Sequence, residues 1–96
     1  MAALSTIQKE LKRHKPRLVQ KYRVKKIGVF GSYAYGGAKK NSDVDILVEF
    51  HEPIGLAFVD LADELEKILH HRVDLVSRAG IKPKYFQQVK KDVRYV

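Results

Sequence analysis

Cysteine is missing from this sequence of 96 residues. Its absence excludes disulfide bonds, thiolate zinc sites and cysteine nucleophiles, so the interior has to be held by packing alone. Long apolar runs are missing too. No stretch approaches the length needed to span a bilayer, and the N-terminal segment MAALSTIQKELKR lacks the apolar core of a signal peptide. We therefore expect residues 1–96 to form a single cytoplasmic domain without a membrane segment.

Acidic residues are scarce outside the middle of the chain, and the net charge is +8. Residues 1–42 contain eleven Lys or Arg and one acid, whereas residues 43–74 contain nine acids and two Lys or Arg. Residues 75–96 are basic again, with six Lys or Arg and one acid. Such basic flanks can contact nucleic acid, hold the phosphates of a nucleotide, meet an acidic protein partner, or simply keep the surface soluble.

The spacing of apolar residues predicts alternating helices and strands. Residues 4–22 follow helical spacing, with Ser5 or Thr6 available as a cap and Pro16 as a point where the helix kinks or restarts. Further along the chain, the pattern predicts strands over residues 25–30, 42–50 and 72–77, a short helix after the first strand, and helices over residues 55–69 and 84–93. This succession predicts an α/β fold in which a small mixed sheet of three or more strands is flanked by helices.

A Gly-Ser turn and two acids stand close together in residues 31–49, which read GSYAYGGAKKNSDVDILVE. Asp43 and Asp45 are two positions apart in an expected strand, so their side chains project to the same face of the sheet. Two carboxylates placed in this way repel each other unless a cation lies between them or one of them is protonated. A bound magnesium ion is the simpler explanation, although an Asp-x-Asp pair on its own often marks a turn or a helix cap.

Asp74 is a lone acid within the third apolar strand, in the segment RVDLV. An acid between apolar strand residues requires a reason. The structural explanation is a carboxylate at the end of a strand that faces solvent or pairs with Arg72 or Arg78.

These residues resemble the minimal nucleotidyltransferases of the DNA polymerase beta superfamily, whose pattern is Gly-Ser, a short helix, and then Asp-x-Asp on the next strand. The matching residues are Gly31, Ser32, Asp43 and Asp45. The family also places a third carboxylate on a later strand beside the first two, and Asp74 fits that position. The resemblance covers nearly the whole chain, including the ending IKPKYFQQVKKDVRYV, and it implies the polymerase beta-like nucleotidyltransferase fold.

The resemblance also implies a role for each matching residue. Gly31 permits a tight turn and Ser32 offers a hydroxyl at the start of the short helix, so both are expected to bind the triphosphate of ATP. Asp43 and Asp45 supply the oxygen ligands that Mg²⁺ prefers. Asp74 completes a second metal position or accepts the proton of the attacking hydroxyl. The implied reaction is nucleotidyl transfer with release of pyrophosphate.

Tyr35 departs from the family pattern, which commonly has an arginine three residues after the motif serine. A tyrosine can donate a hydrogen bond or stack on a base, but it cannot neutralise phosphate charge. Lys39, Lys40 or another basic residue would have to compensate. Without such compensation we expect slow transfer, or binding of the nucleotide without transfer.

Small proteins of this family are typically encoded beside a HEPN-domain partner. The resemblance therefore implies an antitoxin that uses ATP and Mg²⁺ to attach AMP to a tyrosine of a HEPN ribonuclease. A chain of this length leaves no residues for a domain that holds the acceptor, so we expect a partner chain to supply it. The basic arms can meet that partner or the RNA bound to it. An exposed sheet edge in so small a domain also permits a homodimer or a hetero-oligomer.

Two alternatives remain open at this point. One is a binding antitoxin with the same fold that blocks its partner by contact and performs no chemistry. The other is a catalytic subunit that nucleotidylates a small molecule or an RNA end together with a helical partner chain. The three acids Asp43, Asp45 and Asp74 are consistent with all three functions.

Overall fold

Helix α1 (Leu4–Tyr22) begins the part of the chain that the computed structural model describes, residues 3–96. The helix runs through Pro16 without restarting. Proline removes one backbone donor from the helix, but Leu11 and Leu18 are both fully buried on either side of it. Tertiary packing of this apolar stripe therefore keeps α1 continuous across the proline.

The N-terminal end of α1 differs from the expected one. Ala3 occupies the N-cap position and no side chain forms a capping hydrogen bond there, so the prediction of a Ser5 or Thr6 cap is wrong. The helix ends at Tyr22, and the next residue, Arg23, adopts the left-handed conformation with φ of 59°. This conformation turns the chain back into the first strand.

The sheet has four strands in the order β3-β2-β1-β4. Strands β1 (Val24–Phe30) and β2 (Val44–Phe50) are antiparallel, whereas β3 (Val73–Ser77) runs parallel to β2. The short strand β4 (Arg94–Tyr95) pairs with β1 at the opposite edge, and the sequence pattern did not indicate it. The predicted mixed sheet with flanking helices is thus confirmed.

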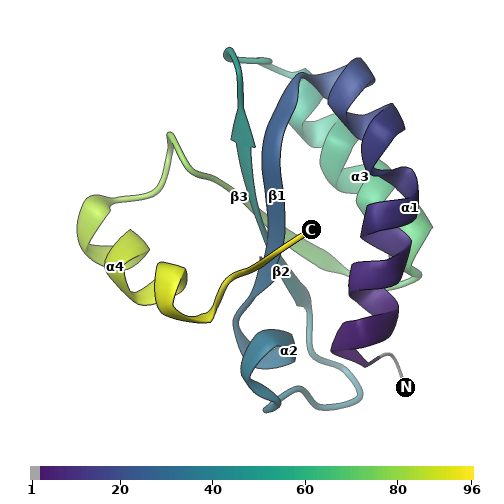
Figure 1. The fold of residues 1–96 in the computed structure, drawn as a ribbon, viewed down its shortest axis with the longest axis vertical. Coiled ribbons are helices and arrows are strands. Elements are labelled where there is room, and N and C mark those ends of the chain that lie inside the picture. The colour runs from purple at the N-terminus through teal and green to yellow at the C-terminus, as the bar shows by residue number, and fades with distance from the viewer. Residues whose placement is uncertain (1–2) are drawn as a thin grey trace.

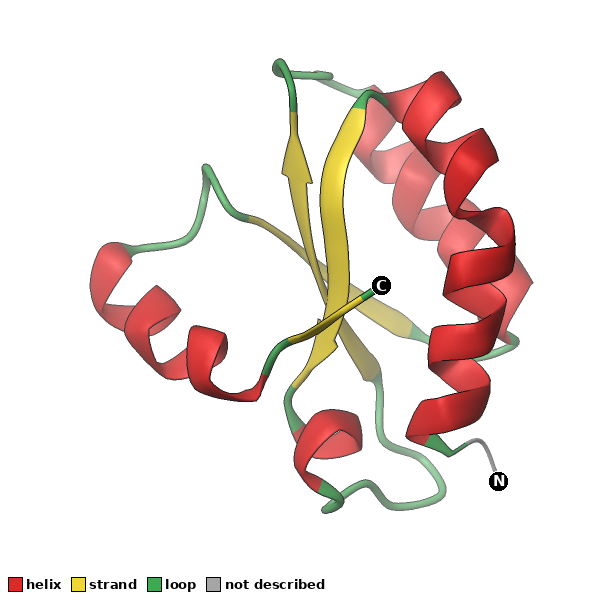
Figure 2. Ribbon diagram, viewed as in Figure 1, coloured by secondary structure: helices red, strands yellow, loops and turns green. Residues whose placement is uncertain are grey.

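The two faces of the sheet are covered differently (Figure 1). Helices α1 and α3 (Ala57–Leu69) lie side by side over one face, while α4 (Pro83–Asp92) lies over the other (Figure 2). The short helix α2 (Ser32–Tyr35) follows β1 at one end of the sheet. None of the helices within residues 3–96 combines the length and the apolar character that crossing a membrane requires.

The main core lies between the sheet and the pair α1 and α3. Its fully buried side chains include Leu11 and Leu18 of α1, Ile46 of β2, and Leu61 and Leu65 of α3. Each large aliphatic side chain buried in this way stabilises the fold by roughly 1.5–3 kcal/mol. A smaller cluster on the other face joins α4 to the sheet through Phe30, Leu47 and Val89.

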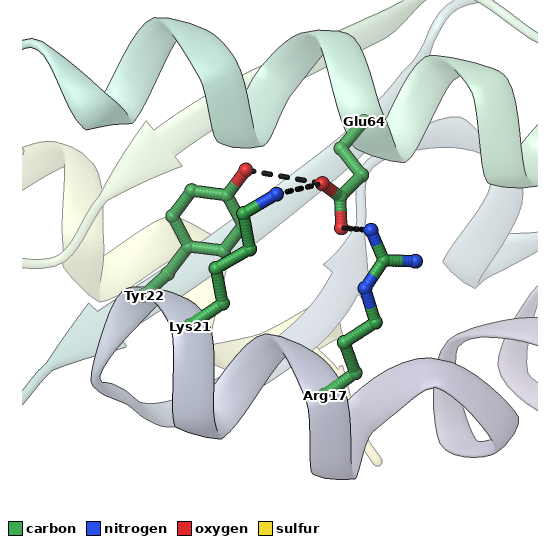
Figure 3. Close-up of polar contacts among 4 residues, drawn as sticks. All are labelled: Arg17, Lys21, Tyr22 and Glu64. Atoms are coloured by element: carbon green, nitrogen blue, oxygen red, sulfur yellow. Dashed lines mark hydrogen bonds and ion pairs between the residues drawn. The ribbon is translucent and has the colours of Figure 1, made fainter.

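Glu64 connects the two helices of the main layer (Figure 3). Its Oε1 accepts hydrogen bonds from Lys21 Nζ at 3.0 Å and from the Tyr22 hydroxyl at 3.1 Å, and Arg17 Nη2 lies 3.3 Å from Oε2. Burial alone would raise the pKa of Glu64, but these hydrogen bonds and positive charges outweigh burial and hold the pKa below its ordinary value. The amphipathic pattern of α3 predicts its acids Asp60, Asp63, Glu64 and Glu66 on the solvent side, and the structure instead places Glu64 between the helices.

Candidate active site

A sharp turn separates β1 from α2. Gly31 has φ of 70° and ψ of −152°, a conformation that essentially only glycine adopts. A Cβ atom at this position would overlap Oδ2 of Asp45 and lie 3.0 Å from its Cγ. Glycine therefore serves two needs here, because it permits the turn and leaves room for the carboxylate. Ser32 follows directly as the first residue of α2.

Strand register brings the acids to this turn. Asp45 is paired with Phe30, the last residue of β1, and on its other side with Asp74 of β3. Because β2 and β3 are parallel, Asp45 and Asp74 stand at the same level near the starts of their strands. Asp43 lies just before β2 and is exposed. Residues predicted from three separate segments thus meet at one end of the sheet.

The carboxylates lie on the face of the sheet opposite to α1 and α3. Ile46 and Val48 of β2 point into the main core, so Asp45 and Leu47 point to the other face, which α4 covers in part. On β3 the same alternation places Asp74 with Val76 on the α4 side. The acids are therefore reachable from solvent, beside α4.

The proximity of the carboxylates changes the acidity of Asp45. Partial burial raises its pKa, and the charge and hydrogen bonding of Asp74 and the charge of Asp43 raise it further, to about 6. Burial is the larger cause of the raised pKa, and the neighbouring carboxylates add to it. A cation bound beside Asp45 would favour its ionised form.

Comparison with known families agrees with this geometry. The family model for the nucleotidyltransferase domain matches residues 11–96. The chain belongs to this nucleotidyltransferase family. Both the fold and the enzyme class that the Gly-Ser and Asp-x-Asp pattern implied are therefore confirmed.

This nucleotidyltransferase is similar in sequence to protein adenylyltransferases and in structure to toxin–antitoxin complexes. Protein adenylyltransferase MntA of Thermococcus cleftensis is 45% identical over 97 residues, which cover 100% of this chain and 98% of the relative. A solved toxin–antitoxin structure with AMP-PNP is similar with a TM-score of 0.73 and 29% identity, over 88% of this chain and 70% of that chain. Another contains the tri-AMPylated HEPN toxin of Shewanella oneidensis in complex with its MNT antitoxin; its TM-score is 0.66 at 25% identity, over 92% of this chain and 70% of that chain.

The carboxylate oxygens of Asp43, Asp45 and Asp74 fit a magnesium ion that binds together with a nucleotide. Among residues 3–96, no three His, Cys, Asp or Glu side chains are arranged as a group that could hold a metal by themselves. Asp45 and Asp74 are nevertheless adjacent, with Asp43 close enough to raise the pKa of Asp45. Mg²⁺ is usually bound through one or two carboxylates, with phosphate oxygens and waters completing its octahedron. Adjacent carboxylates with room left open match that mode better than a closed cage would.

Two basic side chains flank the acids. Arg72 Nε lies 3.4 Å from Asp43 Oδ1, and Lys40 and Arg72 both line a cavity of about 290 Å³ beside Asp43. Arg72 thus pairs with Asp43 and not with Asp74. Arg78, the other expected partner of Asp74, lies over the ring of Phe86 at 3.7 Å. The position of Arg72 two residues before Asp74 was visible in the sequence, but only the parallel register places it against Asp43.

The two tyrosines of α2 have different surroundings. Tyr33 is buried, with its ring edge-on to that of His71 at 6.2 Å between centroids, so it belongs to the core. Tyr35 is 66% exposed and covers Gly37 of the following loop. Lys39 and Lys40 lie in the same loop, where the Lys39 backbone N–H donates to Ser42 Oγ at 2.8 Å. Of these two lysines, Lys40 is the one that lines the cavity beside Asp43.

Proposed function

We propose that this protein is a magnesium-dependent protein adenylyltransferase, which transfers AMP from ATP to a tyrosine hydroxyl of a HEPN-domain toxin and so acts as its antitoxin. The observation that carries the proposal is the position of Asp45 between the Gly31 turn and Asp74. This arrangement supports a reaction at one end of the sheet, in which the turn binds phosphate, the carboxylate oxygens bind the metal and Asp74 accepts a proton. The similarity to a complex that contains a tri-AMPylated HEPN toxin supports the choice of acceptor.

Each residue of the site has a part in the proposed reaction. The turn at Gly31 and the hydroxyl of Ser32 hold the triphosphate, and Asp43 and Asp45 are the first ligands of Mg²⁺, with Asp74 beside them. When bound, Mg²⁺ neutralises the charge that develops on the pyrophosphate. Arg72 and Lys40 add positive charge at the edge of the same site.

The chemical step is a displacement at the α-phosphorus of ATP. The tyrosine oxygen forms a bond to the α-phosphorus while the bond to the pyrophosphate oxygen breaks. Asp74 accepts the proton of the tyrosine hydroxyl, because its carboxylate is exposed on the face from which an acceptor approaches. The products are an AMP–tyrosine phosphodiester and pyrophosphate.

Transfer of label from [α-³²P]ATP to a HEPN-domain protein, sought as the product of the neighbouring gene, tests the proposal. We expect the wild type to label the partner, and Asp43→Asn and Asp45→Asn to lower the rate by at least about a hundredfold, since each variant loses an oxygen ligand of the metal. Asp60→Asn is the matched control, because this exposed acid of α3 lies on the covered side of the sheet. It should retain the wild-type rate.

The same experiment separates the alternatives. If the partner is not labelled but is still inhibited by both Asp43→Asn and Asp45→Asn, the protein acts by contact alone and the enzymatic proposal is wrong. If label appears only on a small molecule or on an RNA end, the acceptor has been assigned wrongly while the nucleotidyl transfer stands.

A further inference from the structure

Helix α4 lies directly beside the carboxylates. It packs on Leu47 and Val76 of the sheet, and these residues follow Asp45 and Asp74 by two positions. Residues two apart on a strand share a face and are separated by roughly 6.5–7 Å along it. Helix α4 therefore borders the open side of the site, on the face that α1 and α3 leave free (Figure 2).

The exposed surface of this segment is strongly basic. Five cations are exposed between residues 82 and 94, against Asp92 as the one acid: Lys82, Lys84, Lys90, Lys91 and Arg94. Among the ion pairs of residues 3–96, none involves any of these five. On α1, in contrast, Arg13, Arg17 and Lys21 each pair with a glutamate. Within residues 3–96, these five cations of the α4 segment thus have no ion-pair partner.

Helix stability explains the positions of only some of these charges. Lys90 and Lys91 lie in the last turn, where cations interact favourably with the helix dipole. Lys82 and Lys84 lie at the opposite end, and the first turn of α4 contains no acid. Positive charge at a helix N-terminus is unfavourable by a few tenths of a kcal/mol or more. The helix dipole therefore does not account for Lys82 and Lys84.

Aromatic side chains accompany this basic surface. Tyr85 of α4 is 54% exposed and Tyr95 of β4 is 45% exposed. Exposed tyrosines are enriched in surfaces that bind other proteins, because they offer a rigid apolar ring together with a polar hydroxyl. Lys84 and Lys91 span about 10 Å of helix at 1.5 Å per residue. That length suits an extended anionic surface better than one triphosphate, which also has to reach the turn at Gly31.

We propose that α4 and β4 form the docking surface for the protein acceptor, and that they bind an acidic segment of it that lies next to the tyrosine to be modified. The inference rests on the proposed function. An acceptor has to approach the face that carries Asp45 and Asp74, since α1 and α3 cover the other one. An acceptor on this face comes close to α4, whose charge favours a partner of opposite charge.

Charge reversal at Lys84 and Lys91 tests this surface. Both side chains are exposed, and neither belongs to the site described above. The double variant Lys84→Glu/Lys91→Glu should raise KM for the partner protein by about tenfold or more and leave KM for ATP within about twofold of the wild type. The matched control is Lys9→Glu/Lys12→Glu on α1, which makes the same change in net charge on exposed residues behind the opposite face. It should change neither constant by more than about twofold.

Three results test the docking surface on α4 and β4. Equal KM values for the partner in both double variants overturn the docking surface, even though AMP transfer by the wild type would still support the proposed function. Loss of binding to a 20-nucleotide single-stranded RNA by Lys84→Glu/Lys91→Glu, with an unchanged KM for the partner, overturns it in favour of nucleic acid. If the wild type transfers no AMP, direct binding of the partner to the two double variants still tests the surface: weaker binding by the α4 variant alone supports it, and equal binding refutes it.

A folding defect would be recognised by thermal unfolding, which should agree with the wild type within a few degrees for both double variants. Should the glutamate variant not fold, Lys84→Gln/Lys91→Gln removes the same cations without adding like charge. We then expect KM for the partner to rise as well, but only by about threefold.

Discussion

Replacing Gly31 by alanine adds one methyl group at the centre of the site. Two costs follow from the structure. The backbone conformation, with φ of 70° and ψ of −152°, costs a residue with a side chain about 1–3 kcal/mol. The new Cβ would also overlap Asp45 Oδ2 and lie 3.0 Å from Cγ, where ordinary contacts begin at 3.4 Å. Overpacking of this kind costs about another 1–3 kcal/mol.

Gly36→Ala provides the matched control. Gly36 has φ of 90°, so alanine is strained there as well, but no atom lies within 4 Å of an added Cβ. The backbone cost alone is about 1–2 kcal/mol. Urea denaturation in the absence of metal should therefore place Gly31→Ala about 1–3 kcal/mol below Gly36→Ala, with an unchanged m-value. AMP transfer should be lost in Gly31→Ala and largely retained in Gly36→Ala.

A double-mutant cycle isolates the contact with Asp45. Asp45→Ala removes Oδ2 and Cγ, so Gly31→Ala in that background should pay only the backbone cost. The coupling free energy between the two positions should therefore be about 1–3 kcal/mol. A coupling below about 0.5 kcal/mol would refute the reasoning, because it would mean that the turn and the carboxylate are not in contact.

Three further predictions use the same assays. The pKa of Asp45, about 6 in the folded protein against 3.8 as the ordinary value, makes the metal-free protein lose stability as pH rises from about 4 to above 6. Asp45→Asn should therefore stabilise it at pH 7.5 by about 1 kcal/mol, a value reduced for solvent screening, and not at pH 3.5; a constant difference across this range would contradict the shift. Glu64→Gln should destabilise the protein by about 1 kcal/mol at pH 7. The lowered pKa of Glu64 contributes stability at pH values above the ordinary pKa of 4.5, and this stability is lost as pH falls. Glu10→Gln is the control, because the ion pairs of Glu10 are 3.7–3.8 Å long, and it should change the free energy of unfolding by less than about 0.5 kcal/mol. Ser32→Ala should raise KM for ATP by about three- to tenfold without shifting the urea midpoint, and an unchanged KM would remove Ser32 from the nucleotide site.

Much of the architecture could be predicted from local pattern. Apolar periodicity located α1, α3 and α4 and three of the strands to within a few residues, because buried positions recur at intervals that differ between helix and strand. The cap of α1 was misplaced, since several small polar residues near a helix start can serve equally well. Strand β4 was missed, because two exposed residues carry no periodic signal and form a strand only through pairing with Gly28 and Val29.

Glu64 shows a second kind of failure. Its position among the acids of an amphipathic helix predicted a solvated side chain. The structure places it against Lys21 and Tyr22 of α1, more than 40 residues earlier in the chain. Helical spacing indicates which side chains share a face of α3. Which helix packs against that face depends on the tertiary fold of the whole domain.

The sequence alone determined the local parts of this site: a glycine that permits the turn, a serine after it, and Asp43 and Asp45 two positions apart at the start of a strand. The tertiary structure decided which distant residues join them. Parallel pairing of β2 with β3 sets Asp74 beside Asp45 and Arg72 beside Asp43, and packing on Leu47 sets the basic helix α4 at the open side. Side-chain alternation is a property of each strand and can be seen in the sequence, whereas register and layer order depend on burying the apolar faces of all the elements together.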